Sequence, residues 1–188
     1  ISTVNMLGCH DGIPLLDLKG LLPKEEIQSL IDRIVSRGGM VKNLHGQKNL
    51  YYQVNATYYS ALGESDETML LARAIQMFMP GKPQIWYLDL FAGKNDHEAV
   101  QRAGESGHKE INRTNLSVDQ IAEGLKKDVV QKQLALIRMR NTHKAFSEGA
   151  EVTISGEESS LEIRWEYDGA YAELHVNFEE GTYTIESN

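Results

Sequence analysis

The chain lacks several features that would assign it to a special class. It has one cysteine, Cys9, in 188 residues, which excludes an internal disulfide and points to a reducing compartment such as the cytoplasm. No apolar run approaches the roughly 18 residues of a membrane span, and the net charge of −8 argues against a nucleic-acid-binding surface. An initiator methionine is also missing, because the sequence starts at Ile1 in a strand-like segment. We therefore expect the C-terminal portion of a larger polypeptide, with neither a membrane nor a nucleic acid as partner.

The most informative segment is the apolar run 4–9 followed by His10, Asp11 and Gly12. Such a run is typical of a buried strand, and a glycine directly after it permits a sharp turn. Barrel enzymes place catalytic side chains at the C-terminal ends of their strands. A polar pair at a strand end is equally typical of simple capping or solvation, so this motif leaves both interpretations open.

Hydrophobic periodicity predicts helices and strands along the middle of the chain. Apolar residues at helical spacing, with acidic residues near the start, predict helices over 23–37 and 65–79. Residues 84–88 are predicted to form a strand and residues 89–116 a long loop. Ser117, with a glutamine three positions later, predicts the start of a further helix that runs to about residue 141.

The periodicity changes near residue 149. Apolar and polar residues then alternate over 161–167 and again over 170–178, and Asp168-Gly169 between them is a two-residue hairpin signal. A further strand is predicted around Tyr183. The patterns indicate an α/β segment over residues 1–146 and a small antiparallel β domain over residues 147–188.

Three stretches together resemble the sucrose phosphorylase branch of glycoside hydrolase family 13. They are Cys9–Gly12, Tyr52–Leu62 and Met79–Arg113, and the resemblance is continuous over roughly residues 4–145. It implies that the α/β segment is the C-terminal part of a (β/α)8 TIM barrel, and that the tail is the β domain that follows the barrel in this family.

The resemblance also implies roles for individual residues. In this family two carboxylates, a nucleophile and an acid/base, cleave the glycosidic bond with retention. Asp11 takes the place of a third carboxylate that stabilises the transition state, and His10 and Arg113 take the places of groups that bind the glucosyl unit. Gln53 falls on the loop that faces the acceptor. Because the nucleophile and acid/base of the family precede the position of Ile1, we expect the chain alone to be inactive and to need the N-terminal portion of the same protein.

The segment before Gln53 bears on the acceptor. Relatives carry an acidic residue there, whereas this chain has His45 and Lys48 nearby. These cations suit a phosphate ester, which favours sucrose 6-phosphate over sucrose as the substrate that phosphate cleaves. Lys48 as a solvated loop residue is the competing interpretation. Glucosylglycerate phosphorolysis and another family 13 glycosidase activity stay open.

No cofactor and no metal are expected. Asp96, His97 and His108 lie in the predicted loop, but they lack the spacing of zinc ligands. A hypothesis of another class is a non-catalytic carbohydrate-binding fragment, since residues 147–188 form a small sheet that carries Trp165 on one face. The apolar neighbours of Trp165 indicate that this face is buried. The sequence does not determine an oligomeric state.

Overall fold

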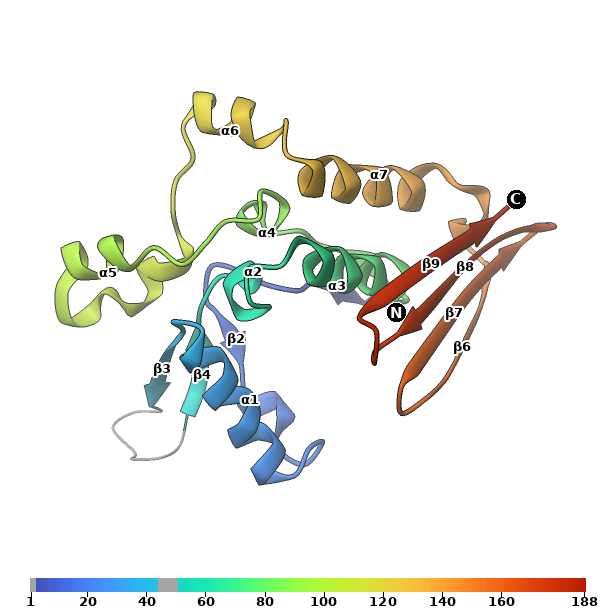
Figure 1. Ribbon diagram of the computed structural model, residues 1–188. Coiled ribbons are helices and arrows are strands. Elements are labelled where there is room, and N and C mark those ends of the chain that lie inside the picture. The colour runs from blue at the N-terminus through green and yellow to red at the C-terminus, as the bar shows by residue number, and fades with distance from the viewer. Residues whose placement is uncertain (1–2, 44–50) are drawn as a thin grey trace. The chain divides into compact units, whose positions relative to one another are not determined.

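The computed structural model describes residues 3–43 and 51–188 (Figure 1). The chain divides into two compact units. Unit 1 consists of Ile1–Met6, Asp66–Gln84 and Leu125–Asn188, and unit 2 of Leu7–Ser65 and Ile85–Gly124. Each unit joins segments that lie far apart in the sequence. The domain boundary expected at residue 146 stays a prediction.

Unit 1 contains a pair of short parallel strands, β1 (Val4–Asn5) and β5 (Lys82–Pro83). Parallel neighbours that are separated in sequence require a crossover connection, as in a barrel built from strand–helix repeats. Helix α3 (Asp66–Phe78) ends shortly before β5 and confirms the helix predicted over 65–79. The buried side chain of Gln76 on α3 donates to the carbonyls of Asn5 and Gln84 and thereby ties the helix to the strand pair.

Helices α3 and α7 (Asp128–Thr142) of unit 1 are joined through buried polar groups. The Arg73 Nε donates to Gln133 Oε1 at 2.8 Å, and a second guanidinium nitrogen donates to Gln76. A buried cation is costly unless it is hydrogen-bonded, and these bonds from two of its guanidinium nitrogens offset part of the cost of burying Arg73 in the apolar face of α3.

The C-terminal part of unit 1 is an antiparallel sheet in the order β6-β7-β8-β9. Its strands are β6 (Glu151–Glu157), β7 (Ser160–Tyr167), β8 (Ala170–Asn177) and β9 (Thr182–Ser187), and the one-turn helix η3 (Lys144–Phe146) precedes them. Asp168 and Gly169 join β7 to β8 with φ of 46° and 76°. Positive φ at both positions is the type I′ geometry that the Asp-Gly pair predicts. The sheet is confirmed, and β6 is a strand that the sequence analysis did not predict.

Trp165 fixes the buried face of this sheet on the rest of unit 1. Its indole Nε1 donates to the carbonyl of Phe78 at 2.6 Å, and its ring lies against Phe146 and under the guanidinium of Arg140, whose Cζ is 4.2 Å from the ring. The ring is only 8% exposed. It is therefore a core residue and not a platform for sugar stacking.

Unit 2 begins with a three-stranded antiparallel sheet in the order β2-β4-β3. Its strands are β2 (Ile13–Pro14), β3 (Met40–Asn43) and β4 (Tyr51–Asn55). The helical elements of this part are η1 (Leu16–Leu18), α1 (Lys24–Ser36) and α2 (Tyr58–Ala61). The helix predicted over 23–37 is confirmed as α1. Its buried Ile31 and Ile34 pack with Leu15, Val54 and Ala56 in one apolar cluster.

The second part of unit 2 corrects two expectations. Residues 84–88 are not a strand: Trp86 caps the one-turn helix α4 (Tyr87–Leu90). A short apolar run does not by itself distinguish a strand from a buried helical turn. Here the N–H groups of Leu90 and Phe91 donate to the carbonyls four residues before them, which is helical bonding. The predicted loop 89–116 contains α5 (His97–Ala103) and the 3₁₀ segment η2 (Gly104–Asn112).

The helix predicted over 117–141 is two helices. Helix α6 (Val118–Gly124) of unit 2 begins with the predicted cap, in which the backbone N–H of Gln120 donates to Ser117 Oγ and the Gln120 side chain accepts from Ser117 N. Lys127 has an extended backbone and starts α7. None of the helices in the described part of the chain combines the length and the apolar character that crossing a membrane requires.

Candidate active site around Asp11

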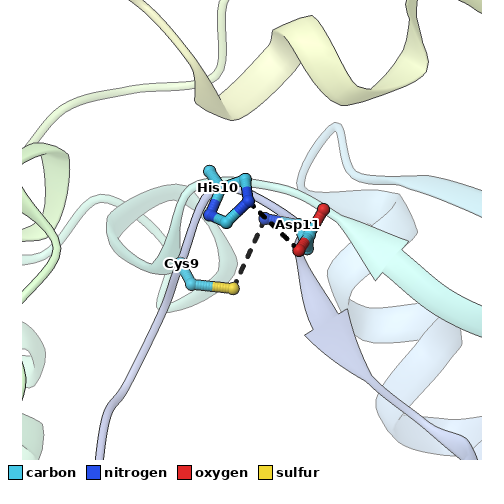
Figure 2. Close-up of side chains that lie close together, drawn as sticks. All are labelled: Cys9, His10 and Asp11. Carbon is cyan, nitrogen blue, oxygen red and sulfur yellow. Dashed lines mark hydrogen bonds and ion pairs between the residues drawn. The ribbon is translucent and has the colours of Figure 1, made fainter.

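The segment Gly8–Gly12 turns sharply before β2, and two glycines make that turn possible. Gly12 has φ of 104°, and a Cβ there would lie 2.7 Å from the carbonyl oxygen of Val54. A Cβ on Gly8 would lie 2.8 Å from a carboxylate oxygen of Asp89. Any other residue at either position would collide with its neighbour. The turn presents the side chains of His10 and Asp11 together (Figure 2).

Buried side chains hold the first peptide groups of this turn. Asp89 on α4 accepts from the N–H of Gly8 at 3.0 Å. Asn112, at the end of η2, donates from Nδ2 to the carbonyl of Cys9 at 2.6 Å. Both residues are 1% exposed. The backbone before His10 is therefore fixed by polar groups that water does not reach.

The next two carbonyls also accept hydrogen bonds from side chains. Arg113 Nε donates to the carbonyl of His10 at 3.0 Å. Asn55 on β4 donates from Nδ2 to the carbonyl of Asp11 at 2.8 Å, and Gln53 donates to the same oxygen. We call the five side chains that hold this turn, Gln53, Asn55, Asp89, Asn112 and Arg113, the backbone cage. Rigid support of this kind is what a preorganised catalytic group requires.

The Asp11 carboxylate has three basic side chains within 3.5 Å. Lys109 Nζ lies 2.8 Å and Arg113 Nη2 3.5 Å from Oδ1, and His10 Nε2 lies 3.2 Å from Oδ2. The hydrogen bond from Lys109, followed by the charges of Lys109, His10 and Arg113, lowers the pKa of Asp11 below its ordinary value. Because the side chain is still 46% exposed, an ionised carboxylate faces accessible space.

The imidazole of His10 lies beside an aromatic pair. Its ring centre is 5.9 Å from that of Trp86, and Trp86 lies 4.4 Å from Tyr87. The Tyr87 hydroxyl donates to the carbonyl of Thr114 at 2.6 Å, and burial raises the pKa of Tyr87. Trp86 and Tyr87 therefore pack beside His10, and the Tyr87 hydroxyl connects this aromatic pair to the segment after Arg113.

A polar cavity of about 590 Å³ adjoins Arg113 within unit 2. Asp96, Arg102, Glu110 and Thr114 are among the residues that line it. Asp96 accepts from Ala99 N as the cap of α5 and from the Thr114 hydroxyl, so it has a structural function there.

Three potential metal ligands, Cys9, His10 and Asp11, have their ligand atoms within 4.8 Å of one another (Figure 2). Two of them are already engaged, since Cys9 Sγ accepts from the Asp11 N–H at 3.3 Å and Lys109 binds the Asp11 carboxylate. A cation as close as Lys109 opposes metal binding at this carboxylate. The group therefore gives no support for a metal site.

The structure brings together four of the six residues that the sequence proposed for the site: His10, Asp11, Gln53 and Arg113. Gln53 is 4% exposed and directs its amide at the turn, so any contact with an acceptor stays a prediction. His45 and Lys48 lie outside the described residues.

Sequence reasoning missed Asn55, Asn112 and Lys109. Asn112 stands directly before Arg113, and Asn55 is two residues after Gln53 on the same face of β4, so both positions gave a signal. Lys109 gave no signal that distinguishes it from other lysines of the chain, and its contact with Asp11 is seen only in the structure. Asp89 supports the turn through its bond with the Gly8 N–H.

We compared the chain with known protein families, sequences and structures. No family model matches the chain. The crystal structure of sucrose 6F-phosphate phosphorylase from Thermoanaerobacter thermosaccharolyticum matches all of the chain with a TM-score of 0.93 and 39% identity, and the match covers 38% of that protein. The chain thus has the fold of the C-terminal part of a phosphorylase of the sucrose phosphorylase type, a barrel segment followed by an antiparallel β domain.

Curated relatives make the similarity more specific. The sucrose 6(F)-phosphate phosphorylase of Ilumatobacter coccineus is 53% identical over 98% of the chain, and the sucrose phosphorylase of Bifidobacterium adolescentis is 36% identical over 92%. The chain spans 37% and 36% of the length of these relatives. The chain is therefore homologous to sucrose 6(F)-phosphate phosphorylases over about a third of their length, and the family resemblance seen in the sequence is confirmed.

Proposed function

We propose that the full-length protein containing this chain is a retaining glucoside phosphorylase. It transfers the glucosyl unit of sucrose 6-phosphate to inorganic phosphate and releases glucose 1-phosphate and fructose 6-phosphate. The observation that carries the proposal is the ionised, accessible Asp11 carboxylate on a backbone held by buried side chains. The 53% identity to a sucrose 6(F)-phosphate phosphorylase supports the choice of substrate.

In the proposed reaction two carboxylates outside this chain perform the bond-breaking steps. One attacks the anomeric carbon while the other protonates the leaving oxygen of fructose 6-phosphate, and phosphate then displaces the enzyme carboxylate with retention. Positive charge develops on the sugar ring in both steps. A fixed negative group such as Asp11 stabilises that charge more in a preorganised site than in water.

The remaining site residues bind and orient substrate in this proposal. His10 and Arg113 donate hydrogen bonds to hydroxyls of the glucosyl unit, and Gln53 faces the acceptor side. His45 and Lys48 bind the phosphate ester of fructose 6-phosphate, in keeping with the preference of phosphate for cationic donors. A cytoplasmic location agrees with the single cysteine, and because the nucleophile and acid/base of the proposed reaction lie outside this chain, the chain alone is inactive.

The test is a donor comparison with the purified full-length protein. We expect glucose 1-phosphate to form in the presence of phosphate with sucrose 6-phosphate as the best donor, ahead of sucrose and glucosylglycerate. Asp11→Asn should lower kcat by about 100-fold or more, the effect of losing one such electrostatic group. Asp119→Asn, the same change at an exposed residue of α6, is the matched control.

Each outcome of this comparison decides between alternatives. If glucose 1-phosphate formed from glucosylglycerate alone, glucosylglycerate and not sucrose 6-phosphate would be the substrate. Hydrolysis without any dependence on phosphate would indicate a glycosidase. If no donor reacts, the phosphorylase proposal is wrong. Sugar binding by the β domain would favour the carbohydrate-binding alternative, against which the burial of Trp165 argues.

A further inference from the structure

Lys109 approaches the Asp11 carboxylate more closely than the other basic side chains of the described residues do. Its Nζ lies 2.8 Å from Oδ1, compared with 3.2 Å from His10 Nε2 to Oδ2 and 3.5 Å from Arg113 Nη2 to Oδ1. The Lys109 side chain is also less exposed than its partner, 30% against 46%. The Lys109 ammonium therefore contacts the less exposed side of the Asp11 carboxylate.

Arg113 is less available to Asp11 than Lys109 is. Its Nε donates to the His10 carbonyl, and its Nη1 lies 3.6 Å from Glu110. Among the described residues, the charged and titratable side chains near the Asp11 carboxylate are thus Lys109, His10, Arg113 and Cys9, with Glu110 behind Arg113. Among them Lys109 makes the short hydrogen bond and is the first cause of the lowered pKa of Asp11.

We propose that Lys109 is a positioning residue of the glucosyl-transfer site, which fixes Asp11 through Oδ1 and leaves Oδ2, on the side of His10, for the sugar. The inference rests on the proposed function. It follows from the geometry of a carboxylate, whose two oxygens can serve two partners at once. With the cage holding the backbone of Asp11, the contact from Lys109 removes the remaining freedom of its side chain.

The proposal has a structural consequence for the segment 97–113. This segment supplies Lys109 and Arg113 to the carboxylate and Asn112 to the backbone beneath it. The site is then complete only when α5 and η2 are folded against the turn. A group that acts through another group is recognised by its dependence on that group, and this dependence can be measured.

The experiment is a double-mutant cycle in the full-length protein with Lys109→Met and Asp11→Asn. Misplacement of a reacting group by about 1 Å can cost about 100-fold in rate. We expect Lys109→Met to lower kcat/KM by about tenfold or more through kcat, and to cost almost nothing further when Asp11 is already asparagine. Lys109→Arg keeps a charged donor and should restore most of the activity. Equal losses from Lys109→Met in both backgrounds would overturn the proposal.

The pH profile separates positioning from a general effect on folding. Lys109 favours the ionised form of Asp11, so its removal raises the pKa of Asp11. The acid limb of kcat/KM should then move to higher pH in Lys109→Met and return in Lys109→Arg. Lys94→Met is the matched control, because Lys94 pairs at 2.5 Å with Glu64, a carboxylate that the proposed reaction does not use. An unmoved acid limb in Lys109→Met would contradict the inference.

The same double-mutant cycle, measured as Tm, tests the ion pair between Lys109 and Asp11 independently of activity. The four proteins of the cycle are compared in Tm at neutral pH. Coupling between Lys109 and Asp11 in Tm supports the contact, and strictly additive changes overturn it. If the wild-type protein releases no glucose 1-phosphate, the proposed function fails on that result alone, whereas an active wild type with an unaffected Lys109→Met variant leaves the function intact and removes Lys109 from it.

Discussion

Replacement of Asn112 by leucine is the sharpest test of the backbone cage. Asn112 makes one hydrogen bond to the turn, from Nδ2 to the Cys9 carbonyl at 2.6 Å, and its Oδ1 has no hydrogen-bond partner among the described residues. Leucine keeps a branched side chain of comparable length but offers no donor. The variant therefore removes one bond and leaves one buried carbonyl without that donor.

The magnitude follows from the burial of this bond. A buried polar group that loses its partner costs about 1–3 kcal/mol of stability. The lost bond precedes His10 by one peptide group, so relaxation of the turn displaces His10 and Asp11 together. We expect kcat/KM to fall by roughly 10- to 100-fold, since displacements of about 1 Å have effects of that size.

The assay is phosphorolysis of the best donor by the full-length protein, with Tm measured on the same preparations. Asn141→Leu, the same change at an exposed position of α7, is the control and should leave both quantities near their wild-type values. A fall in Tm with kcat/KM within about twofold of wild type would refute the reasoning, because the cage would then stabilise the fold without positioning the site. If both Tm and kcat/KM were unchanged, the hydrogen bond from Asn112 to the Cys9 carbonyl would contribute neither to stability nor to catalysis.

Three further predictions concern single side chains. Arg113→Lys keeps the charge but loses the planar fork of donors, so kcat/KM should fall by about tenfold or more with little change in Tm; a large fall in Tm with normal kinetics would make Arg113 a structural residue. Lys48→Ala should reduce the preference for sucrose 6-phosphate over sucrose, measured as the ratio of kcat/KM values, by about tenfold; an unchanged ratio would return Lys48 to the solvated loop. Trp165→Phe removes the donor to the Phe78 carbonyl, so the free energy of unfolding should fall by about 1–3 kcal/mol while kcat/KM stays unchanged; an unchanged Tm would show that the indole bond is not needed.

Local pattern was sufficient for much of the secondary structure. Helix α1 repeats apolar residues at helical spacing, the Asp168-Gly169 pair forms the I′ turn that its residue types favour, and Ser117 caps α6 with Gln120. These features depend on residues within a few positions of one another. A sequence states such relations directly, because backbone geometry fixes which near neighbours meet.

The segment 84–88 shows where local pattern fails. Its apolar residues fit a strand and a buried helical turn equally well, and the structure makes Tyr87–Leu90 helical. Leu90 and Phe91 there donate to the carbonyls four residues before them, which local pattern does not reveal. This helical turn also contacts a distant part of the chain, because Asp89 accepts from the N–H of Gly8, 81 residues away.

Some features of the site were likewise visible in the sequence, and others only in the structure. The sequence by itself determined that a histidine, an aspartate and a glycine stand together after an apolar run, and its resemblance to a known family indicated Asp11 and Arg113. Only the tertiary structure decided that Asn55, Asn112 and Lys109 hold that turn, through contacts that span 44, 103 and 98 residues. The physical reason is that side chains so far apart in sequence meet only through the path of the whole chain, and neither periodicity nor spacing encodes that path.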